Sequence, residues 1–327
     1  MINPPLNREL CVAPMMKWTD RHCRRMLRLF APNAHMYTEM VTTGALIHGP
    51  RSKLLEFTTA EQPLAIQLGG SDPKDLATCA RMAEIAGFVE VNLNVGCPSV
   101  RVKKGAFGAV LMKAAPLVSE CIKAMQDAVK IPVTIKCRLG VDELDSQEFL
   151  FDFIGQCHQA GCTTFIVHAR KAYLNGISPA ENRDIPPLQP ERVYALKEAF
   201  KQCQFIMNGG LKTVQQVLEH NQKLDGSMLG RAAYQDPWTL CKIEHALFAT
   251  PMPDHPSVVV KQLIPYIESE LAQGVRLHQI TRHMMGIFNG LPGARAFRRT
   301  LSDFPKQNQP SIRHLHGAID QIMERAA

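Results

Sequence analysis

One cysteine of this 327-residue chain stands apart from the other nine because of the residues around it. Cys97 lies between Gly96 and Pro98, directly after a strand-like apolar run, and Gly105 and Gly108 follow as hinges of a polar loop. A cysteine taken alone is more often a small residue of the core. Cys97, however, lies in a strand-to-loop turn rather than in an apolar stripe, so we predict that a mobile loop presents its thiol to a substrate.

Three more side chains at the ends of strand-like segments indicate a site for an anionic ring. Lys136 ends the segment PVTIK, where an unpaired buried charge would be costly unless an anion lay beside it. A reduced flavin carries negative charge near N1 and O2, and a lysine would tune it. Gln67 can both donate and accept at a flavin edge, although a strand-end glutamine also bonds to backbone. His168 either binds phosphate or caps the strands.

Glycine turns follow the last two strand-like segments. They are Asn208-Gly209-Gly210 and Gly230-Arg231. Consecutive glycines let backbone N–H groups approach an anion, and Arg231 adds positive charge. The loops after the seventh and eighth strands of a (β/α)₈ barrel usually hold phosphate. We therefore predict a phosphate site here, and a tight turn without a ligand is the alternative.

Strand-like runs alternate with amphipathic helical patterns over the first two thirds of the chain. The predicted strands are residues 10–16, 34–40, 63–69, 89–95, 132–139, 164–170, 205–209 and 226–230. The clearest helix begins at Asp72 as cap and stops at Gly87, and residues 115–129 and 148–160 are similar. Eight such units predict an α/β protein with a (β/α)₈ TIM barrel, whose active groups stand at the carboxyl ends of the strands. A doubly wound open sheet is the alternative, but no G-x-G-x-x-G follows the first strand.

The pattern changes after Trp238. Residues 250–256, TPMPDHP, are typical of a linker, and helical patterns follow at 257–273, 277–288, 294–302 and 312–325. From His255 onward the chain has nine Lys and Arg and five Asp and Glu. This excess of four positive charges is more than half of the net charge of +7. An excess of this kind is compatible with a nucleic-acid partner. We predict a catalytic barrel over residues 1–249 and a basic helical domain over residues 250–327.

Composition limits the class of protein. Hydrophobic residues make up 46% of the chain, which is typical of a globular protein. No run approaches the ~18–20 apolar residues of a membrane span, and the start, MINPPLNREL, lacks the apolar core of a secretion signal. Ten cysteines without a C-x-x-C pair argue against a zinc ribbon or a disulfide framework. The sequence predicts a cytoplasmic protein that needs no metal, membrane or obligate protein partner.

The chain resembles the tRNA-dihydrouridine synthases in motifs that span nearly its whole length: APMM, IQLGG, NLNVGCPS, IKCRLG, IVHAR, MNGG and LGRAAY. ENRDIPPL and NGLPGARAFRR are similar to the DusA subfamily, which acts on D-loop uridines at tRNA positions 20 and 20a. The resemblance implies FMN as cofactor, NADPH as electron donor, and a barrel followed by a helical tRNA-binding domain. It implies Cys97 as the acid and FMN contacts at Pro14, Met15, Met16, Gln67, Lys136, His168, Asn208, Gly209, Gly210, Gly230 and Arg231.

The implied reaction fits these residues. A hydride passes from flavin N5 to uracil C6, and charge then builds towards C5 and O4. A thiol on the opposite face of the base can give C5 its proton as a general acid, so Cys97 must be protonated, unlike a nucleophilic thiolate. Asn94, on the strand before Cys97, is placed to hold the base or its ribose. The uridine must leave any stack to reach a buried flavin.

A basic helix face is predicted near the end of the chain. In GARAFRR, Arg295, Arg298 and Arg299 are spaced i, i+3 and i+4, so they share one face that suits a phosphate backbone or a base edge. Arg183, in the long loop after the sixth strand, is a further candidate for tRNA contact. An ordinary solvated basic face is the alternative.

The loop after Cys97 departs from the subfamily pattern. Val100 stands where the subfamily usually has an acidic residue, and Lys103, Lys104 and Ala106 also differ. We expect the implied chemistry to survive, because Arg101, Gly105 and Gly108 remain. Lid closure and the local tRNA contact are the features that the changes would affect.

Two other functions would use the same residues differently. A dihydroorotate dehydrogenase-like enzyme for a free pyrimidine would share the barrel, Lys136 and the glycine turns, but would need no basic helical domain. A non-catalytic RNA-binding barrel would need neither Lys136 nor Cys97. A yellow purified protein that acts on tRNA, and not on uracil or orotate, would exclude both.

Overall fold

The centre of the molecule is a closed barrel of parallel strands. The computed structural model describes residues 6–99, 105–304 and 312–326, and in these the strands are β1 (Leu10–Val12), β2 (His35–Thr42), β3 (Leu64–Gly69), β4 (Glu90–Val95), β5 (Val133–Arg138), β6 (Thr164–His168), β7 (Gln204–Asn208) and β8 (Gly226–Leu229). They follow one another around the barrel in chain order, and β8 pairs with β1 to close it. The predicted (β/α)₈ barrel and all its predicted strands are confirmed.

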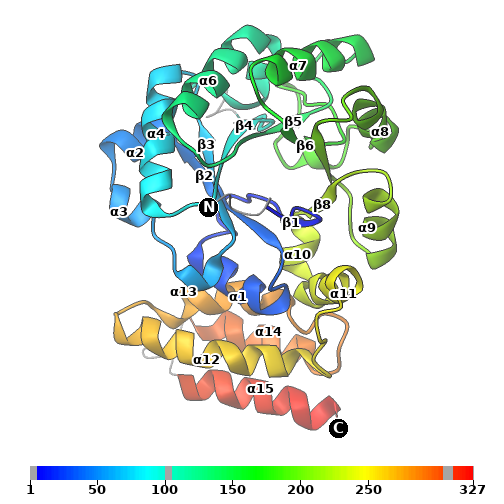
Figure 1. Cartoon of the computed structure of the whole chain (residues 1–327). Helices are drawn as coiled ribbons and strands as arrows, with labels where there is room; N and C mark the ends of the chain where they lie inside the picture. Colours follow the sequence, from blue (N-terminus) through cyan, green and yellow to red (C-terminus); the bar gives the residue numbers. More distant parts are fainter. Residues whose placement is uncertain (1–5, 100–104, 305–311, 327) are drawn as a thin grey trace.

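Helices cover the outside of the barrel and form a further layer at the C-terminal end (Figure 1). Around the barrel lie α1 (Arg21–Phe30), α2 (Thr43–His48), α3 (Arg51–Leu54), α4 (Pro73–Ala86), α6 (Ala115–Ala128), α7 (Gln147–Gln159), α8 (Pro190–Ala199), α9 (Val214–Asn221), α10 (Arg231–Gln235) and α11 (Pro237–Phe248). The C-terminal layer contains α12 (Pro256–Ala272), α13 (Leu277–Thr281), α14 (Ala294–Asp303) and α15 (Ile312–Ala326). Short 3-10 turns are η1 (Thr59–Glu61), η2 (Gly108–Lys113), η3 (Glu181–Arg183) and η4 (Arg282–Gly286).

Local sequence signals explain where these elements begin and end. At α4 the Asp72 carboxylate accepts the Asp75 N–H, Pro73 occupies the first turn, and Gly87 ends the helix with a left-handed φ of 96°. β1 stops at Val12, before its predicted end at residue 16. The reason is a turn in which the N–H and C=O of Met15 both bond to the Thr19 hydroxyl, at 2.9 and 3.2 Å.

The predicted helix over residues 277–288 is wrong in its second half. The chain tightens into η4 where the backbone of Gly286 reaches α10, and a Cβ at Gly286 would lie 2.3 Å from the carbonyl oxygen of Gln235. In the same turn the side chains of Arg282 and His283 contact the Asp20 carboxylate at 2.6 and 3.0 Å. The contacts of this segment with the barrel therefore determine its conformation and override its helical sequence pattern.

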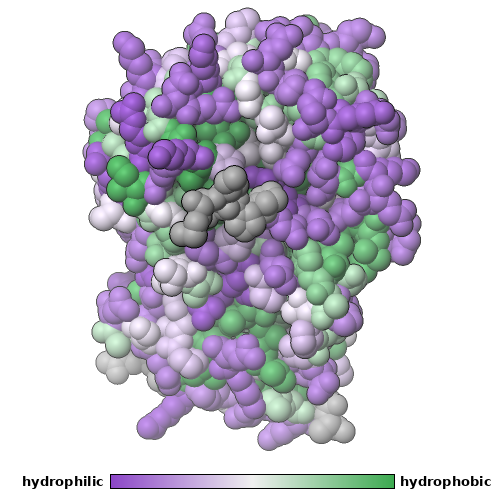
Figure 2. All heavy atoms as spheres, in the orientation of Figure 1, coloured by the Kyte–Doolittle hydropathy of each residue, from purple (hydrophilic) through white to green (hydrophobic). Residues whose placement is uncertain are grey.

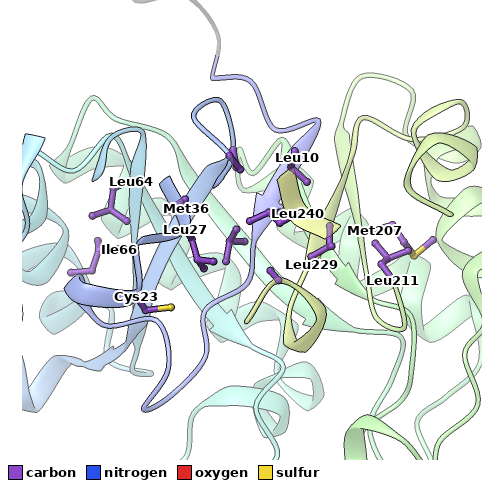
Figure 3. Close-up of a cluster of buried hydrophobic side chains, with 14 of the residues drawn as sticks. Leu10, Cys23, Leu27, Met36, Leu64, Ile66, Met207, Leu211, Leu229 and Leu240 are labelled. Atoms are coloured by element: carbon purple, nitrogen blue, oxygen red, sulfur yellow. The ribbon is translucent and has the colours of Figure 1, made fainter. Parts of the chain in front are cut away.

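Apolar side chains form two layers because successive residues of a strand point to opposite faces. The outer layer lies between strands and helices, where Leu64 and Ile66 of β3 and Met36 of β2 belong to the same buried cluster as Leu27 of α1 (Figure 3). The inner layer is small and consists of Cys11, Ala13, Tyr37, Ala65, Ile166, Ile206 and Met228. The rest of the barrel interior is lined by polar side chains, several of them fully buried.

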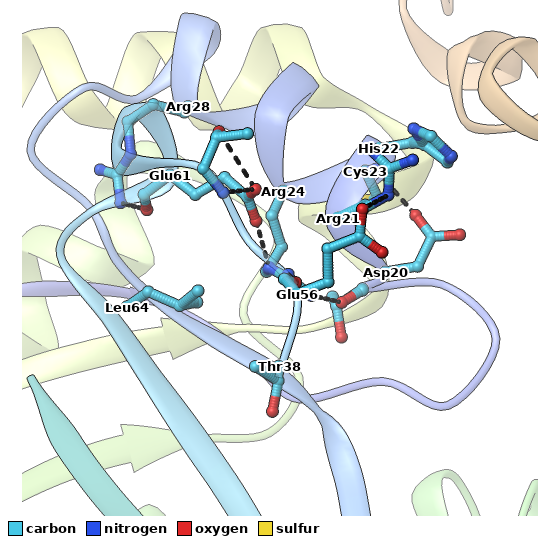
Figure 4. A network of polar contacts seen from close by, with 12 residues as sticks. Asp20, Arg21, His22, Cys23, Arg24, Arg28, Thr38, Glu56, Glu61 and Leu64 are labelled. Atoms are coloured by element: carbon cyan, nitrogen blue, oxygen red, sulfur yellow. Dashed lines mark hydrogen bonds and ion pairs between the residues drawn. The ribbon is translucent and has the colours of Figure 1, made fainter. Parts of the chain in front are cut away.

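Helix α1 joins the barrel to the C-terminal layer through its arginines (Figure 4). Arg24 bonds to the Glu61 carboxylate at 2.7 Å, and Arg28 donates to the carbonyl oxygen of Glu61 at 2.9 Å. Arg21 reaches the other way, to Glu270 of α12, with both hydrogen bonds within 2.6 Å. The first helix after β1 is thereby fixed to residues from both regions.

The C-terminal layer lies against α1 and close to α11 (Figure 1). Residues 249–255 connect α11 to α12, and Ala249 ends α11 with a left-handed φ of 53°. Figure 2 shows hydrophilic side chains over most of the visible barrel helices, with hydrophobic ones in smaller areas. No helix within the described residues is long and apolar enough to cross a membrane.

Candidate active site

The carboxyl ends of the strands meet at one mouth of the barrel, and Lys136 of β5 lies there beside Asn208 of β7. The Lys136 ammonium donates to Asn208 Oδ1 at 2.8 Å, and Asn208 Nδ2 donates to the carbonyl oxygen of Met228 at 2.8 Å. Burial, helped by the nearby Arg138 cation, lowers the pKa of Lys136 from 10.5 to about 8. Among the residues that the structure describes, no carboxylate bonds to this ammonium, so an anionic group from a ligand fits beside it.

His168 of β6 packs against the predicted phosphate turn. A Cβ at Gly209 would lie 2.7 Å from His168 Cδ2, so the ring and the turn are in close contact. Burial, and then the cations Arg138 and Lys136, hold the pKa of His168 well below its usual value. The imidazole is therefore neutral at neutral pH and can accept one hydrogen bond and donate another, but adds no charge.

The turn after β7 requires glycine. Gly209 and Gly210 have φ angles of 112° and 72°, and a Cβ at Gly210 would lie 2.4 Å from Leu188 Cδ1. A side chain here would both strain the backbone and collide with Leu188. A small cavity adjoins the turn and is also lined by Gln216 and His220 of α9.

The loop after β6 brings arginines to the same mouth. Arg231, at the start of α10, forms an ion pair with Asp184 at 2.5 Å, where the two side chains are 40% and 58% exposed. Arg170 donates to the carbonyl oxygens of Asp184 and Pro186. Burial, together with the Arg231 cation, lowers the pKa of Arg170 and of Arg183. Three arginines thus lie near one carboxylate, Asp184, and the excess of positive charge would favour an anionic ligand.

Cys97 is half-buried at the base of the loop that follows β4. Its N–H donates to Asn94 Oδ1 at 3.0 Å, and its carbonyl oxygen accepts the N–H of Ala109 at 2.9 Å. The second bond ties the two ends of the loop together, so the loop leaves and rejoins the barrel at one place. Val100, Lys103 and Lys104 lie outside the described residues, whereas Ala106 has a left-handed φ of 53°.

Gln67 and Asn94 lie side by side at the mouth. Gln67 is buried, donates to Asn92 Oδ1 at 2.8 Å and accepts from Asn94 Nδ2 at 2.8 Å. Its side chain thus bonds to neighbouring amides rather than to backbone. Each of its amide atoms keeps one further bonding position for a ligand.

The end of β1 completes the mouth between β8 and β2. Met15 packs against the inner apolar layer, while Met16 is 57% exposed. A Cβ at Gly230 would lie 3.8 Å from Met15 Sδ, so the ends of β1 and β8 adjoin. The residues predicted as a cofactor site, which include Pro14, therefore gather from strands β1, β3, β5, β6, β7 and β8 at one end of the barrel.

Comparison with known proteins assigns the family. Residues 11–323 match the family described as Dihydrouridine synthase (Dus). The chain belongs to this family. It is 54% identical over 316 residues to the tRNA-dihydrouridine(20/20a) synthase of Pasteurella multocida (strain Pm70), covering 96% of this chain and 94% of the relative. It is 51% identical over 316 residues to the protein of the same name from Escherichia coli (strain K12), covering 96% and 91%.

Arg138 is a buried cation of this dihydrouridine synthase that sequence reasoning did not assign to the site. Its Nε donates to the carbonyl oxygen of Gly96 at 3.0 Å, and its Nη1 donates to those of Lys171 and Asn182 at 3.0 and 2.8 Å. Burial lowers its pKa to about 10. Strand alternation in IKCRLG puts Arg138 on the same face as Lys136, and the sequence contains that signal.

The predicted basic face of the synthase lies on α14. Arg295 and Arg299 are exposed and Arg298 is half-buried, while Ala294, Phe297 and Leu301 form the buried side of the helix. The three arginines therefore share one face, as predicted. Arg183 is exposed but belongs to η3 in the loop after β6, apart from α14 in the chain.

Proposed function

We propose that this dihydrouridine synthase reduces D-loop uridines at positions 20 and 20a of tRNA, with FMN as cofactor and NADPH as electron donor. The names of its relatives from P. multocida and E. coli support the choice of substrate. The observation that carries the proposal is the half-buried thiol of Cys97 at the base of its loop, on the mouth that also holds the Lys136 ammonium.

The residues at this mouth fit FMN. The Lys136 ammonium bonds only to an amide oxygen in the described structure, which suits an anionic ring edge, and Gln67 keeps a donor and an acceptor. The glycine turn at Gly209 and Gly210 follows β7, and Gly230 and Arg231 follow β8, which are the strands whose loops usually hold phosphate in such barrels. His168, Asn208 and the residues Pro14 to Met16 would complete the contacts.

The chemistry divides between the cofactor and the protein. FMN, when bound, supplies the hydride for uracil C6. Cys97 holds the proton that C5 needs and gives it up as a general acid, which leaves a thiolate to be reprotonated from solvent. Asn94 would hold the base or its ribose in front of the thiol. The Lys136 cation would stabilise negative charge on the ring that faces it.

The two regions of the chain would have separate tasks. We assign the catalytic site to residues 1–249 and tRNA binding to residues 250–327, with Arg295, Arg298 and Arg299 as contacts and Arg183 joining from the barrel. The positive excess after His255 supports this division. A tRNA substrate would also make the cytoplasm the place of action.

We expect the purified protein to be yellow with bound FMN and to form dihydrouridine in unmodified tRNA when NADPH is supplied. Uracil and orotate should not be reduced, because neither offers a phosphate backbone to the basic face. The measurement is dihydrouridine per tRNA by mass spectrometry of digested nucleosides, with NADPH oxidation followed in parallel. A colourless protein that takes up no added FMN would contradict the proposal, and reduction of orotate would favour the free-pyrimidine alternative.

The lowered pKa of Lys136 predicts how FMN binding depends on pH. The side chain is charged below about pH 8 and neutral above it in the free protein, so the attraction for an anionic ligand is lost as the pH rises through 8. We expect the affinity of the apoprotein for FMN to fall about two- to tenfold between pH 7 and 9, measured by quenching of flavin fluorescence. Lys136→Met should bind more weakly at pH 7 and lose this pH dependence. A flat profile for the unaltered protein would remove Lys136 from the site.

A further inference from the structure

Buried polar side chains form a continuous chain of hydrogen bonds along the inside of the barrel. Glu90, Asn92 and Asn94 alternate along β4, with Gln67 on β3 and Thr134 on β5. All five are buried, and Asn94 is the most exposed of them at 9%. Buried polar groups are costly unless each finds a partner. This chain satisfies them mainly with one another, and its side-chain bonds to backbone N–H groups lie at the Asn94 end.

The lower half of the chain ends on a carboxylate. The Thr134 hydroxyl donates to Glu90 Oε1 at 2.6 Å, and Asn92 Nδ2 donates to Thr134 Oγ1 at 2.8 Å. Arg8 donates to Glu90 Oε2 through Nε and Nη2, at 2.9 and 2.6 Å. Burial raises the pKa of Glu90, but the Arg8 cation, His35 and the hydrogen bond from Thr134 together outweigh it, and the pKa falls to about 2. Glu90 is therefore ionised and accepts hydrogen bonds only.

The upper half of the chain ends on the Cys97 loop. Gln67 Nε2 donates to Asn92 Oδ1, and Asn94 Nδ2 donates to Gln67 Oε1, both at 2.8 Å. Asn94 Oδ1 then accepts the N–H groups of Gly96 and Cys97, at 3.2 and 3.0 Å. Every member thus donates towards Glu90 and accepts from the side of the thiol.

The direction of the whole chain follows from its charged end. Because the Glu90 carboxylate cannot donate, the Thr134 hydroxyl must, and its oxygen is left to accept from Asn92. By the same reasoning, the side-chain amides of Gln67 and Asn94 must each donate towards Glu90. This orientation leaves Asn94 Oδ1 facing the N–H of Cys97. A flipped amide at any step would set two donors or two acceptors against each other in a buried place, which costs ~1–3 kcal/mol.

We propose that Glu90 and Thr134 are positioning residues for Cys97, acting through the amides of Asn92, Gln67 and Asn94. Neither residue touches the thiol. They fix the orientation of the amide oxygen that holds the first residues of the Cys97 loop, and with it the place from which the thiol delivers its proton. The part of this inference that concerns proton delivery rests on the proposed function. The part that concerns the position of the loop does not.

The test interrupts the chain at its hydroxyl. Thr134→Val has nearly the same shape and cannot donate or accept, so Asn92 Nδ2 loses its acceptor. We expect hydrogen exchange at the Gly96 and Cys97 amides to speed up about tenfold, since one such bond is worth about a tenfold change in opening. Dihydrouridine formation in a single turnover by the pre-reduced holoenzyme should slow by about tenfold or more, because small misplacements of a reacting group are costly. Bound FMN and its reduction by NADPH should remain.

Two variants separate positioning from general stability. Thr134→Ser keeps the hydroxyl and should restore both slow exchange and turnover. The Tyr37 hydroxyl also donates to Glu90 Oε1, at 3.0 Å, but is not a link of the chain. Tyr37→Phe should therefore lower the melting temperature and leave hydrogen exchange at the Cys97 amide unchanged. If Thr134→Val does not fold, Thr134→Cys, with a much weaker donor, takes its place.

The outcomes are distinct from those for the proposed function. Wild-type exchange at Gly96 and Cys97 in both Thr134→Val and Thr134→Cys would overturn the inference, whatever the activity. Faster exchange with an unchanged single-turnover rate would overturn the positioning of the thiol. Exchange can be measured on protein that binds no FMN, so a failure of the cofactor assignment would be recognised separately.

Discussion

Replacing Cys97 by alanine should leave a protein that still binds FMN and still oxidises NADPH but forms little dihydrouridine. The thiol is proposed as the proton source for C5, and loss of a general acid typically slows a reaction ~10²–10⁴-fold. The reduction of FMN by NADPH does not need the thiol. Flavin absorbance, NADPH oxidation and dihydrouridine per tRNA, measured on one preparation, would separate the two halves.

Two controls define the role of this sulfur. Cys97→Ser offers a poorer acid in the same place and should lie close to the alanine variant rather than to the unaltered enzyme. Cys203→Ala removes a buried thiol in the connection between α8 and β7, and should lower stability without changing product per flavin. Normal product from Cys97→Ala would rule out the proposed acid.

Removing Arg295 and Arg298 together should weaken tRNA binding by about tenfold or more and make it less sensitive to salt. Each arginine that no longer neutralises a phosphate should reduce the slope of log K against log salt by ~0.7–0.9, so the slope of the double variant should be shallower by ~1.4–1.8. FMN binding should not change, since α14 belongs to the C-terminal layer. Titration of labelled tRNA at several salt concentrations measures both quantities.

The matched control is Arg81→Ala on α4, an exposed cation on the outside of the barrel. It removes one positive charge without touching α14, so it tests whether net charge alone explains weaker binding. Equal effects of Arg81→Ala and of a single substitution at Arg295 would favour a general attraction. Unchanged affinity in the double variant would leave α14 as an ordinary solvated basic face.

The barrel could be predicted because its signals are local. Strand-like runs recur between capped helices, and glycines stand where turns need a left-handed φ, as at Gly87 and Gly210. The site could be predicted because the carboxyl ends of parallel strands must meet, which brings Lys136 close to Asn208 although 72 positions separate them.

Other features depend on long-range packing that no local pattern encodes. The break after α13 follows from the approach of Gly286 to Gln235, and the ion pair of Arg231 follows from the path of a long loop past Asp184. The polar chain inside the barrel left a signal, since Glu90, Asn92 and Asn94 alternate in a strand that otherwise looks apolar. That alternation identifies an inward face but not which strands supply the partners.

The anchoring of α1 has a consequence for how a tRNA would be selected. Arg21 joins α12, while Arg24 and Arg28 join the stretch before β3, so α1 bonds the layer that contains α14 to the barrel that carries the thiol. These bonds would limit how far the α14 arginines can move relative to Cys97. The enzyme would then select the nucleotide that reaches Cys97 by its distance, in the folded RNA, from the part that α14 binds. The identity of the neighbouring bases would matter less.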